Sequence, residues 1–228
     1  MIRNAPAVLT LIRNRLNHSS SYEEKMLWFH EKGITLTKQD EDLFFLKADK
    51  RGHTSNLSPV CNGTIFRGLN LVCYPGPEVE EKTLTQARED GSVLWHEKKT
   101  IFIQPIQGRK LSMYWDTKKE DWFFSDNKKP ISSYHNLVRD RVYNILDTAE
   151  PMFTYNIVFD DTTIYLIEMW NNRLIRRATY DVVRSHAMRM GFKVPDLYLF
   201  EGFDKLERED FPLEVLDKTD TKFLLREM

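Results

Sequence analysis

The stretch IFIQPIQGRKLSMYW, residues 101–115, reads as a buried strand, a tight break at Gly108 and a second strand. Two cations, Arg109 and Lys110, directly follow the glycine. A glycine lets the backbone approach a phosphate closely, and two adjacent cations would neutralise its charge. An ordinary hairpin turn with two exposed cations explains the same residues. Just before the break stands Pro105, whose side chain cannot act as a nucleophile.

The bulk properties indicate a globular protein with a proper core. The chain has 228 residues, of which 41% are hydrophobic and 29% charged, enough for one large domain or two small ones. It contains no long apolar run and no signal-peptide pattern, so we expect an intracellular protein of the cytoplasm, nucleus or a viral particle, without a membrane span. Cys61 and Cys73, the only cysteines, lie in strand-like sequence and are expected to be reduced core thiols.

The charges balance overall but are unevenly distributed. The chain contains 33 Lys and Arg residues and 34 Asp and Glu residues, which gives a net charge of -1. Basic residues predominate in 97–141 and 173–193, whereas the segment from Asp196 onward is acidic. This distribution fits one positive face, and it fits ordinary solvated surface charge equally well. The six histidines are far apart in sequence, so we expect neither a metal site nor a cofactor.

Hydrophobic periodicity predicts helices at both ends of a strand-rich region. Residues 5–17 have helical spacing, and residues 19–33 begin with a capping box, Ser20 and Glu23, and end at Gly33. Further helices are expected over 134–149, capped by Ser132 and Ser133, and over 179–191. Short strands are predicted over 42–48, 63–75, 92–97, 99–106, 110–117 and 121–126, with a hairpin over 152–172 and a last strand over 221–228.

This order of elements predicts an α+β fold of mostly antiparallel sheets with flanking helices. We divide it into an N-terminal helical segment, residues 1–35, and one main domain, residues 36–228.

Several segments, in their order, resemble the covalent nucleotidyltransferase superfamily of RNA ligases and mRNA capping enzymes. They are FRGLNLVCYPGPEVEE (66–81), IFIQPIQGRK (101–110), FTYNIVF (153–159) and TKFLL (221–225). The resemblance implies a nucleotidyltransferase-like fold from about residue 40, in which Arg67 matches the Arg-Gly element and Lys222 the lysine of the last motif. It also implies a lost activity. The Lys-x-Asp-Gly motif reads Pro105-Ile106-Gln107-Gly108, and the carboxylate of the next motif is Val158. Proline has no amine to attack a phosphate.

A non-catalytic member, the cap-binding domain of snurportin, is more closely similar. Its motifs resemble QPIQGRK (104–110), TIYLIEMWNNR (163–173) and DFPLEV (210–215). This resemblance implies that Trp170 stacks on a base and that Arg109 and Lys110 contact phosphates. The remaining members of the predicted nucleotide- or RNA-binding set are Arg67, Lys222 and Arg173, a cation beside the tryptophan.

The resulting hypothesis is a non-catalytic pseudoenzyme that binds a nucleotide, a capped 5′ end or RNA. Two alternatives stay open. One is an active RNA ligase or guanylyltransferase that uses a displaced lysine, Lys98, Lys99 or Lys110. The other is a structural or assembly subunit of a larger particle, with protein partners bound through the N-terminal helices or the acidic tail.

Overall fold

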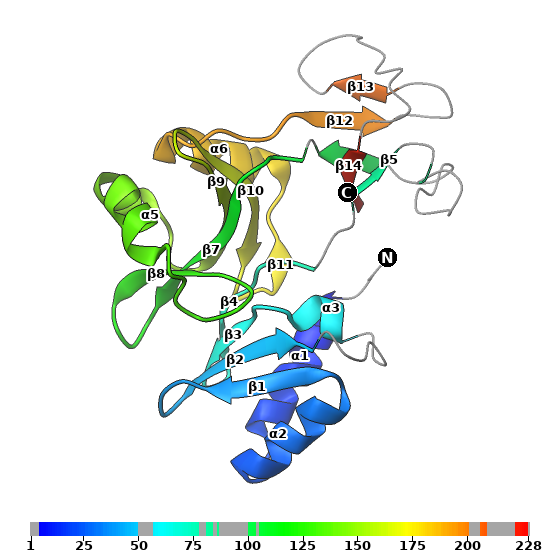
Figure 1. Ribbon diagram of the computed structural model, residues 1–228, viewed down its shortest axis with the longest axis vertical. Coiled ribbons are helices and arrows are strands. Elements are labelled where there is room, and N and C mark those ends of the chain that lie inside the picture. Colours follow the sequence, from blue (N-terminus) through cyan, green and yellow to red (C-terminus); the bar gives the residue numbers. More distant parts are fainter. Residues whose placement is uncertain are drawn as a thin grey trace. The chain divides into compact units, whose positions relative to one another are not determined.

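The computed structural model describes residues 5–49, 57–77, 81–83, 86, 100–103, 105–200, 206–208 and 222–227. The chain forms two compact units. The larger comprises Ile2–Glu78 and Gly108–Val194, and the smaller comprises Met1, Val79–Gln107 and Pro195–Met228. The boundary that we placed after residue 35 therefore lies within the larger unit. The predicted α+β class with antiparallel sheets is confirmed (Figure 1). No helix in the described part of the chain is long and apolar enough to cross a membrane.

Two helices open the larger unit. Helix α1, Ala5–Asn17, has the predicted bounds, and α2 spans Tyr22–Glu31. The N-cap of α2 is Ser21 rather than the predicted Ser20: its hydroxyl accepts the Glu24 N–H, and the Glu24 carboxylate accepts the Ser21 N–H. The prediction was wrong by one residue because the capping pattern Ser-x-x-Glu occurs twice in SSSYEE, and the helix uses the second occurrence.

The first sheet follows directly. Its order is β1-β2-β3-β4, with β1 at Ile34–Lys38, β2 at Leu43–Ala48, β3 at Ile65–Arg67 and β4 at Asn70–Cys73, all antiparallel; α3, Ser58–Cys61, precedes β3. We did not predict β1. The two N-terminal helices pack on this sheet through a shared apolar cluster that includes Leu9, Ile12, Phe29, Leu46 and Phe66 (Figure 1).

The second sheet of the larger unit has the order β11-β10-β9-β7-β8. Its strands are β7, Arg109–Asp116; β8, Asp121–Ser125; β9, Phe153–Phe159; β10, Ile164–Asn171; and β11, Arg176–Arg177. The predicted hairpin is confirmed as β9 and β10. One face of this sheet packs against α5, His135–Val142, the 3-10 helix η1, Tyr143–Thr148, and α6, Tyr180–Met190, through an apolar core.

The ends of these helices test the capping predictions. The helix predicted over 179–191 is confirmed as α6, with Thr179 as its N-cap residue and Gly191, in a left-handed conformation, as its C-cap. Helix α5 begins later than expected, because Ser132 does not cap it. The Ser132 hydroxyl instead accepts the N–H of Tyr134 in a turn that precedes the helix.

The smaller unit contains the third sheet. Its order is β13-β12-β6-β14-β5, with β5 at Glu81–Thr83, β6 at Thr100–Ile103, β12 at Leu197–Phe200, β13 at Leu206–Arg208 and β14 at Lys222–Glu227. The predicted strands at β6 and β14 are confirmed. The predicted strand over 92–97 and the DFPLEV segment, 210–215, lie outside the described residues.

Candidate functional site

Arg109 and Lys110 begin β7 and point to opposite faces of the second sheet. Arg109 opposes Phe159, and its guanidinium carbon lies 4.4 Å from the ring centroid of Tyr134, on the face covered by helices. Lys110 opposes Val158 and lies on the other face, because successive side chains of a strand alternate. Both cations are exposed. The two predicted phosphate contacts are thus not brought together.

The presence of a glycine at position 108 has a structural explanation that we did not identify from the sequence. Its φ is +148°, and a Cβ atom at this position would lie 2.6 Å from the carbonyl oxygen of Phe159 and 2.8 Å from a methyl carbon of Val158. Any larger residue would push the start of β7 away from β9. The close approach that we assigned to a phosphate is made here to the neighbouring strand.

A row of three buried polar side chains crosses the face of the sheet that carries Lys110. Ser112 opposes Asn156, and Asn156 opposes Glu168. The Ser112 hydroxyl donates to the Asn156 Oδ1 at 2.7 Å, and the Asn156 Nδ2 donates toward a Glu168 oxygen at 3.5 Å. We call Ser112, Asn156 and Glu168 the polar row. Burying such groups is costly unless they are hydrogen-bonded, and these hydrogen bonds offset part of that cost.

Sequence analysis did not identify the polar row, although a signal exists. Each member is the one polar residue in a stretch of five that is otherwise aliphatic or aromatic: LSMYW, YNIVF and LIEMW. The apolar neighbours Leu111, Met113 and Ile157 belong to the core under the helices. Strand alternation therefore assigns Ser112 and Asn156 to the opposite face.

Trp170 lies on the same face of β10, two residues beyond Glu168. It is only 6% exposed, and its ring meets that of Tyr74 edge to face with centroids 4.6 Å apart. Its indole N–H is buried and has no hydrogen-bond partner among the residues that the structure describes. A Cβ atom at Gly76 would lie 3.3 Å from this nitrogen and 2.4 Å from a Glu168 oxygen. The stacking role of Trp170 stays a prediction, made for a ring that packs within the protein.

Side-chain hydrogen bonds join the two sheets of the larger unit beside the polar row. The Thr154 hydroxyl accepts the Tyr74 N–H at 3.0 Å and donates to the Asn172 Oδ1 at 2.8 Å. The Asn172 Nδ2 donates to the Val72 carbonyl at 2.9 Å, and the Asn156 Nδ2 donates to the Tyr74 carbonyl at 3.3 Å. This joint holds the end of β4, and with it Gly76, against the polar row.

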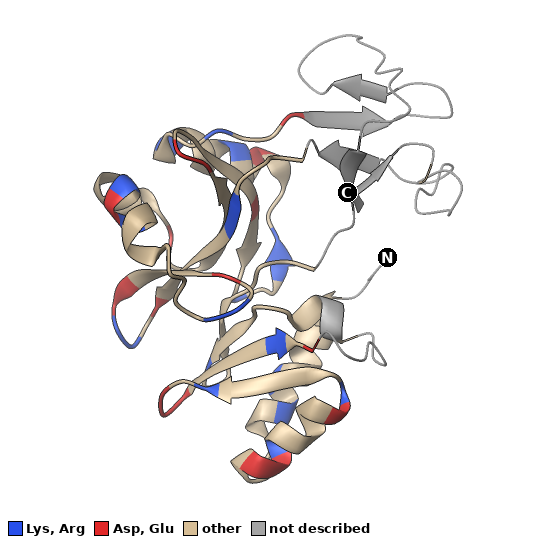
Figure 2. Cartoon of the chain, in the orientation of Figure 1, with Lys and Arg blue, Asp and Glu red and all other residues tan. Residues whose placement is uncertain are grey.

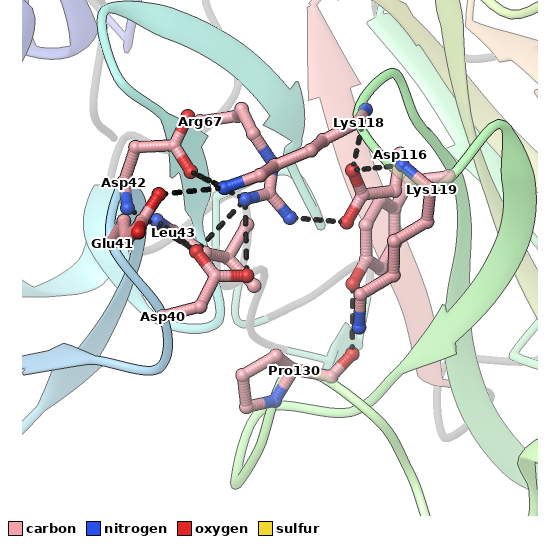
Figure 3. Close-up of polar contacts among 10 residues, drawn as sticks. Asp40, Glu41, Asp42, Leu43, Arg67, Asp116, Lys118, Lys119 and Pro130 are labelled. Carbon is pink, nitrogen blue, oxygen red and sulfur yellow. Dashed lines mark hydrogen bonds and ion pairs between the residues drawn. The ribbon is translucent and has the colours of Figure 1, made fainter.

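Arg67 lies at the end of β3 and is 4% exposed. Its Nη1 donates to Asp40 at 2.8 Å and to Asp42 at 2.6 Å, and its Nη2 donates to Asp116 (Figure 3). Burial disfavours the charge of the guanidinium, but hydrogen bonds to the three carboxylates outweigh it and raise the pKa of Arg67. We call these four residues the Arg67 cluster. A phosphate contact by Arg67 stays a prediction, since the guanidinium is bound within the protein.

The remaining predicted residues are in different parts of the molecule. Arg173 is exposed in the turn between β10 and β11, and β11 itself is basic (Figure 2). Lys222 begins β14 in the smaller unit, where it opposes Thr83. Val158 is a buried residue of β9.

The cysteine prediction is confirmed in that Cys61 and Cys73 are buried free thiols, but only Cys73 lies in a strand, since Cys61 ends helix α3. Burial raises the pKa of both. In the described ranges, no group of three His, Cys, Asp or Glu side chains is arranged to hold a metal ion.

Comparisons with known proteins give a structural likeness only. No protein-family model matches the sequence, and no curated protein matches it. Two solved structures of an archaeal ATP-dependent RNA ligase, forms 1 and 2, are similar with TM-scores of 0.48 and 0.49 and 8% sequence identity in each case. Each match covers 84% of this chain and 53% of the ligase chain, so the chain spans about half the length of those ligases.

Proposed function

We propose that this chain binds a nucleotide, a capped 5′ end or RNA without transferring it. The observation that carries this proposal is the polar row, which lies on the same sheet face as the exposed Lys110. The hydroxyl, amide and carboxylate groups of the row are buried and hydrogen-bonded within the protein, so a base or a ribose would bind by exchanging its hydrogen bonds for theirs. The exposed lysine offers its charge to a phosphate. The buried indole N–H of Trp170 adds a donor beside the row.

Binding without transfer fits the residues that replace the expected catalytic groups. The resemblance to RNA ligases and capping enzymes places Pro105 at the position of the lysine nucleophile and Val158 at that of a motif carboxylate. Neither side chain has an atom that attacks a phosphate or ligates a metal ion.

Fluorescence titration tests the proposal. ATP, GTP, a methylated cap analogue and a short 5′-phosphorylated RNA are each added to the protein while tryptophan emission is recorded. We expect saturable quenching by one of these ligand classes. Lys110→Gln should weaken that response, whereas Lys128→Gln, the same change at an exposed lysine in the turn after β8, should not. A flat response to all four ligands contradicts the proposal and favours an assembly subunit, which purification from the native source would show as a stable complex.

A second candidate is an active ligase or guanylyltransferase with a displaced nucleophile. The favouring observation is Lys110, which lies on the same face as Glu168; Lys98 and Lys99 lie outside the described residues. Radiolabelled ATP or GTP that stays on the denatured wild-type protein, and not on Lys110→Gln, would establish this activity. An unlabelled protein under several divalent metals would exclude it.

A further inference from the structure

A second row of side chains lies next to the polar row on the same face. Lys110 opposes Val158, Val158 opposes Tyr165, and Tyr165 forms a parallel bridge with Lys193. Residues that are paired across neighbouring strands share a face of the sheet. We call Lys110, Val158, Tyr165 and Lys193 the lysine row. Its two lysines are exposed and Tyr165 between them is partly exposed, whereas Val158, between Lys110 and Tyr165, is buried.

The backbone fixes the position of Lys193. Its N–H donates to the Ile164 carbonyl at 2.9 Å, and its carbonyl accepts the Leu166 N–H at 2.8 Å. The preceding residue, Phe192, is buried in the core under the helices. The Lys193 ammonium lies 6.0 Å from the centroid of the Tyr165 ring. This arrangement of a cation beside an aromatic ring is therefore built into the sheet.

The chemistry of the lysine row suits a nucleic-acid strand. An aromatic ring on a sheet face stacks on any base, and lysines beside it neutralise backbone phosphates. Three strand spacings separate Lys110 from Lys193, which places their Cα atoms about 14 Å apart on either side of Tyr165. A mononucleotide carries its phosphates on one side of its sugar only. A nucleotide inside a nucleic-acid strand has a phosphate on each side of its sugar, which matches a lysine on each side of Tyr165.

We propose that the lysine row binds an internal nucleotide of a single-stranded nucleic acid, with its base on Tyr165 and its two phosphates near Lys110 and Lys193. This inference rests on the proposed function, because both use Lys110 and the same face. It goes further by naming a strand, rather than a free nucleotide, as the ligand.

Salt-dependent binding of a labelled oligonucleotide tests the inference. Fluorescence anisotropy with a short oligouridylate should show that Tyr165→Leu lowers affinity about 5- to 150-fold, whereas Tyr165→Phe retains it. For a single strand, each lost phosphate contact reduces the slope of log K against log salt concentration by about 0.7. Lys193→Gln and Lys110→Gln should each produce this change, and Lys128→Gln should leave the slope unaltered. An oligodeoxyuridylate run in parallel distinguishes RNA from DNA.

The outcomes separate the two proposals. If Lys110→Gln weakens binding while Tyr165→Leu and Lys193→Gln do not, the lysine row is wrong and the proposed function stands. Equal affinity and equal salt slope for UMP and the oligonucleotide also overturn the lysine row. If neither ligand binds and the four-ligand titration is flat, both proposals fail. Thermal melts confirm that each variant is folded; should Tyr165→Leu not fold, the slope of Lys193→Gln decides.

Discussion

The larger unit uses its cations in two contrasting ways. In the Arg67 cluster, a buried guanidinium holds Asp40, Asp42 and Asp116 (Figure 3). In the lysine row, two exposed lysines lie on either side of Tyr165 along the row, and the ammonium of Lys193 lies near its ring. The planar fork of an arginine suits several carboxylates at once, whereas a lysine is a mobile point charge for an incoming anion. Burial and pairing, more than the number of positive residues, therefore distinguish a cation that holds the fold from one that is available to a ligand.

Arg67→Met should have the largest effect on stability. It leaves the Asp116 side chain, 2% exposed, without its charged partner. Removal of one partner from a buried ion pair costs about 3–5 kcal/mol of unfolding free energy. Urea denaturation measures the loss, and the exposed Arg173→Met serves as the control with a change within about 0.5 kcal/mol. A similar small loss in both variants would show that the Arg67 cluster does not hold the fold.

Thr154→Val breaks the uncharged hydrogen bonds that join the two sheets, and it should lower the unfolding free energy less than Arg67→Met does. The substitution keeps the shape of the side chain but leaves the Tyr74 N–H and the Asn172 Oδ1 without their partner. Buried groups left unsatisfied in this way cost about 1–3 kcal/mol. Thr154→Ser retains the hydroxyl and should recover most of the loss in the same denaturation experiment. If valine and serine destabilise equally, methyl packing rather than hydrogen bonding explains the joint.

The comparison also shows what the sequence can and cannot predict. Helices α1 and α6 follow from periodicity together with local signals such as Gly191, which acts within one turn. The environment of Arg67 depends on Asp40 and Asp116, 27 and 49 positions away in the chain. No local sequence pattern shows contacts between residues so far apart in the chain. We therefore predicted that Arg67 contacts a ligand rather than these carboxylates. The match to an Arg-Gly motif identified the residue without its surroundings.

The separation of Arg109 from Lys110 was within reach of sequence reasoning. We expected a strand from residue 110, and the strand begins at Arg109. Strand alternation alone then places the two side chains on opposite faces. Alternation along β9 would also have placed Asn156 on the same face as Lys110. It fails for Glu168 in β10, because an irregularity between Leu166 and Glu168 shifts the register. The sequence contains no pattern that predicts this irregularity.

The pH dependence of stability sharpens the account of the Arg67 cluster. Partial burial opposes ionisation of Asp40, but hydrogen bonds from the Asp42 and Leu43 N–H groups and from Arg67 prevail and hold its pKa at about 2. Because an unfolded Asp has a pKa of about 3.9, the contribution of Asp40 is complete above that pH and is lost as pH falls through 2. Its side chain is 34% exposed, so solvent screening keeps the effect smaller than that of Arg67.

Asp40→Asn tests this dependence. The variant should be less stable than the wild type at pH 7, and the difference should shrink between pH 4 and pH 2, as measured by urea denaturation at several pH values. Asp160 also has a lowered pKa, through hydrogen bonds from the Thr162 and Thr163 N–H groups, and Asp160→Asn provides the comparison outside the cluster. A stability difference that is independent of pH would mean that the charge of Asp40 contributes nothing.

The smallest expected change in stability comes from Arg109→Gln, and comparison with Lys110→Gln distinguishes the roles of the two adjacent cations of β7. Arg109→Gln removes the contact with the Tyr134 ring, which at an exposed site is worth about 0.5–1 kcal/mol. Oligonucleotide affinity should stay unchanged, because Arg109 lies on the face covered by helices. Lys110→Gln should do the reverse, with unaltered thermal stability and weaker, less salt-dependent binding. Thermal melts and anisotropy titrations on the same preparations measure both quantities. If the two variants weaken binding equally, the cations act on one ligand, and strand alternation does not divide their roles.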